Sequence, residues 1–385
     1  VQQFDLGLGH GLRNKFAEAK ANGNNEKAAF LVSTAYFSMS VIMVGLFVLL
    51  APVIYILDWN AILNSRSIPI SELRSTILIV LFSFNIRFVF HLMSIILKAD
   101  QRTAISDSFM PIASLISLIS VLIIKIFISD SLLYASAAMA VPPVIVLFVA
   151  NLYFFSHEYR FAIPRLSYIK ILYLRDIYSL GIKFFLGQLL MLIMFSSSNL
   201  ILTRIVDPTE VTLYNIARTY YNLPLTFFMI ILTPYWSAIT EAYIKKEFYW
   251  IRNNMRKLKI IAFIFTAFII VQLVFSDFAF KYWLNDKVII PYNLSLVFVV
   301  YNIIVLFLSP YNYFLNGVGK LNLGLRVGMF KIIFFLPIAI FLVNHFNASG
   351  LVFTLILVNS LPNLLFATVQ YKRIINQTAR GIWNR

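Results

Sequence analysis

Long apolar runs, separated by short polar and charged segments, dominate the pattern of this chain. Each run approaches or exceeds the roughly 20 apolar residues that an α-helix needs to cross a bilayer. The runs lack the alternation of apolar and polar positions that is typical of strands in a membrane barrel. We therefore predict an all-α, polytopic membrane protein with about ten full transmembrane helices. The predicted spans are residues 28–57, 72–97, 105–128, 131–155, 178–205, 211–242, 258–280, 291–316, 322–344 and 347–371.

Composition and charge agree with this prediction. Of the 385 residues, 60% are hydrophobic and 12% are charged, whereas a soluble domain carries about 25% charged residues. The net charge of +16 comes from basic residues between the apolar runs. It therefore indicates membrane topology and does not point to a nucleic-acid partner. If residues 1–27 are cytoplasmic, 23 of the 32 Lys and Arg residues lie in cytoplasmic segments. The positive-inside rule then predicts a cytoplasmic C-terminus.

An internal repeat divides the chain into two halves. In residues 18–37 and again in 241–268, an acidic residue closes one segment and a basic loop leads into an apolar run. Chance similarity between apolar stretches is the alternative interpretation. The repeat predicts two pseudo-symmetric bundles, residues 1–165 and 166–385, related by an axis along the membrane normal. The second half holds six predicted spans and the first only four, so we expect the first bundle to be incomplete. On this pattern the chain begins inside the second span of a twelve-span design, with about 45 residues missing before it.

Three stretches carry a resemblance to a known family. "FDLGLGHGLRNKFAEAKANG" at 4–23 resembles the segment after the second helix of Wzx-type O-antigen flippases and related polysaccharide transporters. "LTPYWSAITEAYIKKEFYWIRN" at 232–253 looks like the end of their eighth helix, and "FLNGVGKLNLGLR" at 314–326 is similar to the loop after their tenth. The resemblance covers nearly the whole chain, but the family's first helix and most of its second are absent.

The resemblance implies a fold, a substrate and a location. The family belongs to the multidrug/oligosaccharidyl-lipid/polysaccharide exporter superfamily, whose members have two six-helix bundles around a central cavity. The implied substrate is an oligosaccharide repeat unit on undecaprenyl diphosphate, turned from the cytoplasmic to the periplasmic leaflet of the bacterial inner membrane. The implied partners are membrane lipid and, for assembly of the glycan, a polysaccharide polymerase and a chain-length regulator.

Polar stripes at helical spacing indicate which helix faces line a cavity. Arg87 and His91 share one face of the span 72–97, and Arg87 lies deep within it. A charged side chain at such a depth is costly unless it faces a cavity or a partner. A guanidinium can bind a diphosphate in bidentate fashion, although a structural pairing is the alternative. The remaining substrate-site candidates are Asn215, Arg218 and Asn222 in 211–242, Asn312 and Asn316 in 291–316, and Lys331 in 322–344.

These polar residues have simpler interpretations as well. The Asn side chains are candidates for binding sugar hydroxyls, but hydrogen bonds between helices are equally common in membrane bundles. Lys331 is close enough to the inner end of its span to snorkel toward water. Asp5, Arg13 and Lys15 lie near the predicted inner mouth, where they either contact lipid headgroups or simply obey the positive-inside rule.

Other kinds of chemistry are not indicated. The chain has no Cys, and its four His residues have no metal-ligand spacing. The "GLGHG" stretch at 7–11 lacks the Lys of a phosphate-binding loop, so a nucleotide site is not predicted. We therefore expect no enzyme and no cofactor, and transport driven by an H⁺ or Na⁺ gradient. A drug or small-solute cation antiporter would favour acidic residues deep in the spans. A membrane-bound polymerase or acyltransferase would favour a larger outer loop than residues 58–71 provide.

Overall fold

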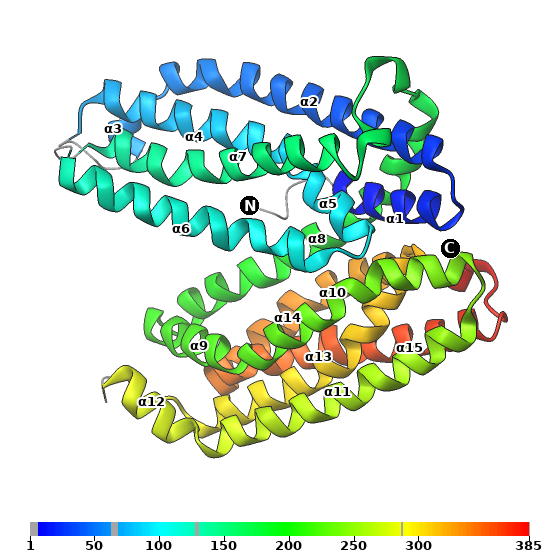
Figure 1. The fold of residues 1–385 in the computed structure, drawn as a ribbon. Coiled ribbons are helices and arrows are strands. Elements are labelled where there is room, and N and C mark those ends of the chain that lie inside the picture. Colours follow the sequence, from blue (N-terminus) through cyan, green and yellow to red (C-terminus); the bar gives the residue numbers. More distant parts are fainter. Residues whose placement is uncertain (1–6, 63–67, 128–130, 286–287, 385) are drawn as a thin grey trace. The chain divides into compact units, whose positions relative to one another are not determined.

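The computed structural model describes residues 7–62, 68–127, 131–285 and 288–384, and over these ranges it contains helices and no strand (Figure 1). This confirms the all-α prediction. The α-helices are α1 (Leu8–Ala21), α2 (Asn25–Ile56), α3 (Trp59–Ile62), α4 (Ile70–Phe90), α5 (Leu92–Ala99), α6 (Thr103–Phe127), α7 (Leu132–Ser156), α8 (Ile171–Ile205), α9 (Pro208–Tyr221), α10 (Leu223–Ile244), α11 (Phe248–Val274), α12 (Ser276–Leu284), α13 (Tyr292–Val318), α14 (Asn322–Thr354) and α15 (Leu361–Ile375). Three short 3₁₀ turns are η1 (Arg160–Ala162), η2 (Leu166–Tyr168) and η4 (Gly381–Asn384), and η3 (Leu355–Ser360) is a π-helix.

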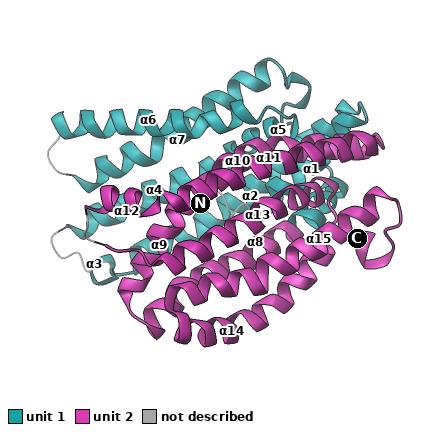
Figure 2. Cartoon of the chain, turned by 90° about the horizontal axis from the view of Figure 1, so that it is seen from below, with its two compact units in different colours: residues 1–181 teal, residues 182–385 magenta. Residues whose placement is uncertain are grey.

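The chain forms two compact units, which Figure 2 colours separately. Unit 1 comprises residues 1–181 and unit 2 comprises residues 182–385, so the boundary lies within α8. The boundary predicted from the sequence, between residues 165 and 166, lies in the loop before α8.

Unit 1 is built around four long helices and the short α1. α7 packs against both α4 and α6, and α4 packs against α2. α1 packs against α2 and α5 and also meets the first turns of α8. At that contact a Cβ atom on Gly11 would lie 2.3 Å from the carbonyl oxygen of Ile177. Only glycine allows the two backbones to approach this closely.

Unit 2 is built around α13. This helix packs against α9, α10, α11, α14 and α15. Its most apolar window is 61% buried, the largest share among the candidate spans found in the described residues. A helix that is apolar on all sides belongs in the centre of a bundle, where every face meets another helix. α13 therefore forms the axis of unit 2.

Nine helical stretches of the described residues are long and apolar enough to cross a membrane. One of them, Asn322–Ile375, joins α14, η3 and α15 in 54 residues, far more than one crossing needs. Within it Asn347 is non-helical, with φ 51° and ψ −137°. Lys331 donates a hydrogen bond of 3.2 Å to the carbonyl oxygen of Asn359. In a straight helix these residues would be about 40 Å apart at 1.5 Å per residue.

The stretch Asn322–Ile375 therefore reverses its direction at Asn347. It contains both predicted spans, 322–344 and 347–371, and the described helices accommodate the predicted ten crossings. Glu210 accepts a hydrogen bond of 3.0 Å from the backbone N–H of Ala348, just after the reversal. A carboxylate is favourable there because the first N–H groups of a helix have no partner within the helix. The predicted span 211–242 differs in one respect: the helix breaks at Asn222, so that α9 and α10 are separate.

Several helices of both units end in the same kind of cap. After α1, Asn24 N–H bonds to the Ala19 carbonyl and Gly23 has φ 66°; after α10, Glu247 N–H bonds to the Ala242 carbonyl and Lys246 has φ 59°. A second pair of ends, after α5 and α13, follows the same pattern. After α5 the backbone N–H of Arg102 donates to the Leu97 carbonyl, and Gln101 is left-handed. After α13 the backbone N–H of Lys320 donates to the Leu315 carbonyl, and Gly319 is left-handed. These are helix C-terminal caps of one type. The helix α15 ends in such a cap as well, with Thr378 bonded to Arg373 and Gln377 at φ 57°, and the repeat between the two halves stays a prediction.

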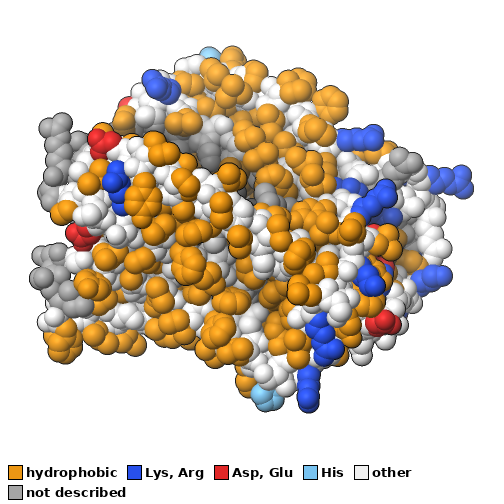
Figure 3. Space-filling view, turned by 90° about the horizontal axis from the view of Figure 1, so that it is seen from above, with side chains coloured by type: hydrophobic (Ala, Val, Ile, Leu, Met, Phe, Trp, Pro, Cys, Tyr) orange, Lys and Arg blue, Asp and Glu red, His pale blue; other side chains and the backbone are white. Residues whose placement is uncertain are grey.

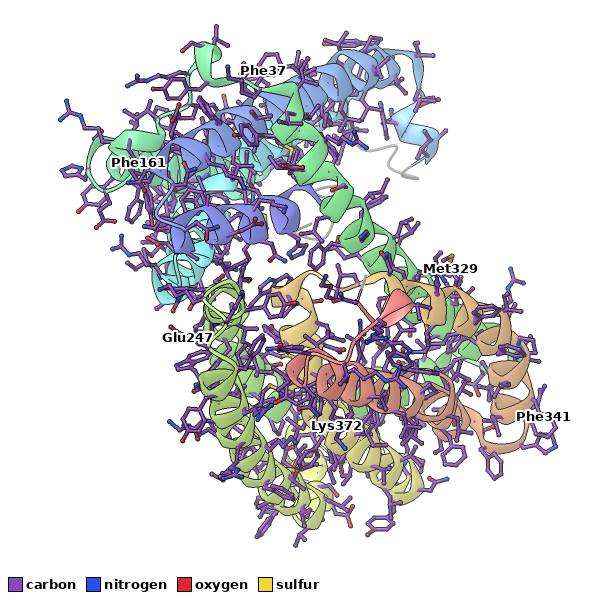
Figure 4. All side chains as sticks on the ribbon, turned by 90° about the vertical axis from the view of Figure 1, so that its right-hand side faces the viewer. Phe37, Phe161, Glu247, Met329, Phe341 and Lys372 are labelled. Carbon is purple, nitrogen blue, oxygen red and sulfur yellow. The ribbon has the colours of Figure 1, made fainter. Side chains whose placement is uncertain are left out.

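Apolar side chains cover much of the outer surface. In the face shown in Figure 3 they occupy the middle, and Lys and Arg side chains gather mostly at one end. Phe37 on α2 and Phe341 on α14, both labelled in Figure 4, are 44% and 61% exposed. An apolar surface of this extent is stable in lipid and would aggregate in water. The fold is that of a multi-pass membrane protein.

Candidate functional site

At the junction of α4 and α5, His91 lines a cavity in unit 1. His91 keeps helical angles (φ −62°, ψ −19°), and the carbonyl oxygen of Phe90 before it accepts a hydrogen bond of 2.9 Å from Asn151 Nδ2 on α7. Asn151 Nδ2 also donates to Leu147, and Asn151 Oδ1 accepts from the hydroxyl of Tyr36 at 2.5 Å. Every polar atom of the Asn151 side chain thus has a partner, which makes this buried amide a stable support. Asn151 thereby joins α7 to α4 directly before His91.

The cavity beside His91 has a volume of about 230 Å³ and is called the α5–α6 pocket here. Lys98 and Asp107, on opposite sides of it, form an ion pair of 2.8 Å. Ser106 donates a hydrogen bond of 3.0 Å to the carbonyl of Ser94, which ties α6 to α5. The residues that line the pocket are His91, Ser94, Lys98, Ser106, Asp107, Phe109, Met110 and Leu147. The lining contains one acidic residue, and Lys98 already neutralises it.

Arg87 lies one turn before His91 on the same helix, as the predicted stripe requires. Its Nη2 atom is 3.2 Å from the sulfur of Met110, which also lines the α5–α6 pocket. A thioether is a weak acceptor and carries no charge. None of the ion pairs found among the described residues involves Arg87. The guanidinium is therefore available for an anion at the pocket.

Helix α1 adds further basic groups. His10 is close enough to Arg13, Lys98 and His91 to interact electrostatically with them. Arg13 is only 5% exposed, so its side chain faces the interior of unit 1. Lys15 forms an ion pair of 2.9 Å with Glu18. Asp5, the third residue predicted at the inner mouth, lies outside the described residues.

The turn between α5 and α6 is anchored by a polar cluster around Asp100. Asp100 accepts a hydrogen bond of 2.7 Å from the hydroxyl of Tyr159 and pairs with Lys20 of α1 at 2.9 Å. Arg102 pairs with Glu158 nearby. Burial, followed by the bond to Asp100, raises the pKa of Tyr159, so this hydroxyl stays protonated and keeps donating. The cluster fixes α1 and the loop after α7 to the end of the α5–α6 pocket.

Unit 2 contains a second basic position at Arg218 on α9. Its guanidinium lies over the ring of Phe195, 5.0 Å from the ring centre. Tyr214 and Tyr301 are close enough to interact electrostatically with it. The described ion pairs do not include Arg218 either. Asn222 separates α9 from α10, and its buried Oδ1 has no hydrogen-bond partner among the described residues. Asn215 lies one turn before Arg218, where its backbone carbonyl accepts from Thr219 at 2.8 Å.

The other predicted residues of unit 2 lie elsewhere. Asn312 and Asn316 are partly buried, one turn apart on α13. Lys331 is 5% exposed and bonded to Asn359 and Asn363, between α14 and the segment formed by η3 and α15. The structure thus brings Arg87 and His91 together in unit 1, and Asn215, Arg218 and Asn222 together in unit 2. Lys331 belongs to a separate cluster.

The sequence did not identify four residues of the unit 1 site. They are His10, Asp107, Met110 and Asn151. His10 belongs to the "GLGHG" stretch, whose glycines now have a packing reason, because Gly11 meets Ile177 on α8. Asn151 could have been found, since a lone Asn in an apolar span needs a buried partner. Asp107 and Met110 carried no such signal, because α6 meets α4 and α5 only in the folded chain.

A family model described as polysaccharide biosynthesis protein matches residues 5–240, more than half of the chain. The chain belongs to this polysaccharide biosynthesis family. A search of curated proteins finds no match. The resemblance to polysaccharide transporters that the sequence showed at residues 4–23 and 232–253 is thereby confirmed at the level of the family.

Solved structures give the fold of this polysaccharide biosynthesis family member. It is similar to a MATE transporter of Vibrio cholerae with a TM-score of 0.79 and 15% sequence identity, over 100% of this chain and 87% of that one. It is also similar to a MOP superfamily transporter of Pyrococcus furiosus, with a TM-score of 0.78 and 15% sequence identity, over 98% of this chain and 86% of that one. An outward-facing MATE transporter of the same superfamily matches with a TM-score of 0.77 and 15% sequence identity, over 98% of this chain and 84% of that one. The chain has the fold of MATE-like transporters of the MOP superfamily.

Proposed function

We propose that this protein is a flippase that moves an undecaprenyl-diphosphate-linked oligosaccharide repeat unit across the bacterial inner membrane, from the cytoplasmic to the periplasmic leaflet. The glycan would serve O-antigen, capsule or exopolysaccharide synthesis. The observation that carries the proposal is the α5–α6 pocket: Asp107 in its lining is neutralised by Lys98, and Arg87, which contacts the lining residue Met110, has no carboxylate partner among the described residues. Such a pocket favours an anion. Membership of the polysaccharide biosynthesis family supports a glycan carrier as that anion.

The chemistry of the substrate fits the residues in both units. A diphosphate offers several oxygen atoms to the Arg87 guanidinium, which can bind two of them in parallel. His91 and Lys98 line the pocket beside it and add hydrogen-bond donors. In unit 2, Arg218 supplies a second unpaired guanidinium, and Asn215, Asn222, Asn312 and Asn316 are suited to sugar hydroxyls. Lys331, enclosed by Asn359 and Asn363, is left out of this binding set.

The proposal includes an orientation and an energy source. The 23 basic residues of the predicted inner segments support a cytoplasmic C-terminus. Arg13 and Lys15 then lie at the cytoplasmic entrance. Transport by alternating access of two bundles draws on an H⁺ or Na⁺ gradient. The flipped repeat unit passes to a polysaccharide polymerase and a chain-length regulator.

The test is a flipping assay with the full chain in proteoliposomes. Undecaprenyl-diphosphate oligosaccharide with a fluorescent sugar is placed in one leaflet, and a membrane-impermeant quencher reports its arrival in the other. A phospholipid with the same label serves as the control for leakage. We expect the labelled glycolipid to cross faster than in empty vesicles, and the phospholipid not to. Equal crossing in both kinds of vesicle, together with uptake of an organic cation, would replace the flippase with a cation antiporter.

A further inference from the structure

Lys331 lies in a closed cage of neutral oxygen atoms within unit 2. Its Nζ atom donates to the Asn359 carbonyl at 3.2 Å, to Asn359 Oδ1 at 3.5 Å and to Asn363 Oδ1 at a shorter distance. Asn363 Nδ2 in turn donates to Asn359 Oδ1 at 3.0 Å. Lys331 is 5% exposed, and its amino group is held between α14, η3 and α15.

Among the described residues, the cage contains no carboxylate to balance an ammonium, and none of the ion pairs involves Lys331. The elements packed against α14 are α8, α9, α13, η3, α15 and η4. Their charged side chains are Arg175, Asp176, Lys183 and Arg204 on α8, Glu210 and Arg218 on α9, and Lys372 and Arg373 on α15. A structural lysine in a bundle is usually paired with a carboxylate, because an unpaired buried charge is costly.

Asparagine suits both forms of the amine. Its amide oxygen accepts from an ammonium, and its NH₂ group can donate to the lone pair of a neutral amine after a rotation. Asn359 is also the fifth of the six residues of the π-helix η3. Single π-helical turns within α-helices are frequent at functional sites. Here the carbonyl of Asn359 is the one that Lys331 contacts.

We propose that Lys331 is the residue at which unit 2 binds and releases the proton that drives transport; this rests on the flippase function proposed above. On release, one N–H bond of the ammonium breaks, its electron pair stays on Nζ, and the proton passes to water. Binding is the reverse. Loss of the charge weakens the hold of Lys331 on Asn359 and Asn363, and the π-helix connects this change to the packing of α15.

Gradient-driven flipping tests the proposal. The full chain in proteoliposomes is assayed with and without an imposed pH gradient, and the ratio of the two rates is the readout. Lys331→Met has a similar length but cannot bind a proton. Lys125→Met is the matched control, because Lys125 is an exposed lysine on α6. We expect a ratio well above one for the wild type and for Lys125→Met, and a ratio of one for Lys331→Met.

The other outcomes are distinct. A ratio that stays above one in Lys331→Met overturns the proposal. A wild type that flips equally fast with and without the gradient also overturns it, but leaves the proposed flippase function standing. If the wild type does not flip the glycolipid, the pH dependence of the Lys331 signal, measured by NMR of the ¹³C-labelled protein in detergent, tests the proton site directly. A signal that is absent in Lys331→Met and moves between about pH 5 and pH 9, the range that includes known buried lysines, supports the proton site although the flippase fails. A Lys331 signal that stays fixed over this range overturns it. Size-exclusion profiles of all variants control for folding.

Discussion

Asn151 Nδ2 donates a hydrogen bond to the carbonyl oxygen of Phe90, the residue directly before His91 at the junction of α4 and α5. Asn151 also donates to the Leu147 carbonyl and accepts from the Tyr36 hydroxyl, so it joins α2, α4 and α7 directly before His91. We expect the position of His91 in the α5–α6 pocket to depend on Asn151, a residue that does not line the pocket.

We expect Asn151→Leu to impair flipping through the position of His91. Removing the amide breaks its hydrogen bonds with the Phe90 carbonyl and the Tyr36 hydroxyl, at a cost of about 1 kcal/mol, typical of polar contacts between membrane helices. The flipping rate and the thermal unfolding of the purified protein are measured together. Tyr36→Phe removes one bond only and should have a smaller effect on both. Equal effects of the two substitutions on flipping would contradict this account.

Arg87→Gln should reduce flipping by about 10- to 100-fold, because a hydrogen bond to a charged group contributes roughly 1.5–3 kcal/mol. The reduction should be smaller when a substrate with a single phosphate replaces the diphosphate. Arg204→Gln provides the matched control, since Arg204 is exposed at the end of α8. If Arg87→Gln and Arg204→Gln reduced flipping alike, the α5–α6 pocket would not be the diphosphate site.

Gly11→Ala should prevent correct packing of unit 1, while Gly45→Ala should be tolerated. The new Cβ at position 11 would lie 2.3 Å from the Ile177 carbonyl, whereas at position 45 no atom lies within 4 Å. Overpacking of this kind costs about 1–3 kcal/mol or more. The measurement is the yield of monodisperse protein and its unfolding temperature in detergent. A Gly11→Ala protein as stable as Gly45→Ala would show that α1 does not pack on α8 as described.

Asp207 should make folding stability depend on pH at the acidic end. The hydroxyl and then the backbone N–H of Thr209 hold the pKa of this N-terminal cap of α9 below its usual range. Because the folded pKa is depressed, the stabilisation is present above the unfolded pKa, near 3.9, and is lost as the pH falls through the folded value.

Asn is an equally good cap but does not titrate. Asp207→Asn should therefore remove the acid dependence and keep the stability measured at neutral pH. Unfolding temperatures of the two proteins between pH 3 and pH 7 test this. A parallel loss of stability in both at low pH would assign the acid sensitivity to other carboxylates.

The amino-acid sequence by itself determined the class and the crossings of this protein. Apolar runs of about 20 residues can satisfy their backbone in lipid only as helices, so the pattern fixes where the chain crosses the membrane. The two runs in residues 322–371 were separate in the sequence, and the hydrogen bonds of Lys331 to Asn359 show that the chain turns back between them. The positions of Arg87 and His91 on one face also followed from helical spacing alone.

The tertiary structure decided what each polar residue meets. The sequence marks Lys331 and Arg87 alike as charged residues within spans, but packing encloses Lys331 between Asn359 and Asn363 and leaves Arg87 beside the thioether of Met110. The bond from Asn151 to the Phe90 carbonyl beside His91 is likewise a product of packing, because its two ends come from different helices. Contacts between helices far apart in the sequence depend on side-chain shape at the interface, and periodicity carries no information about which faces will meet. The sequence specified the helices and their polar faces, and only their packing separated an available cation from a caged one.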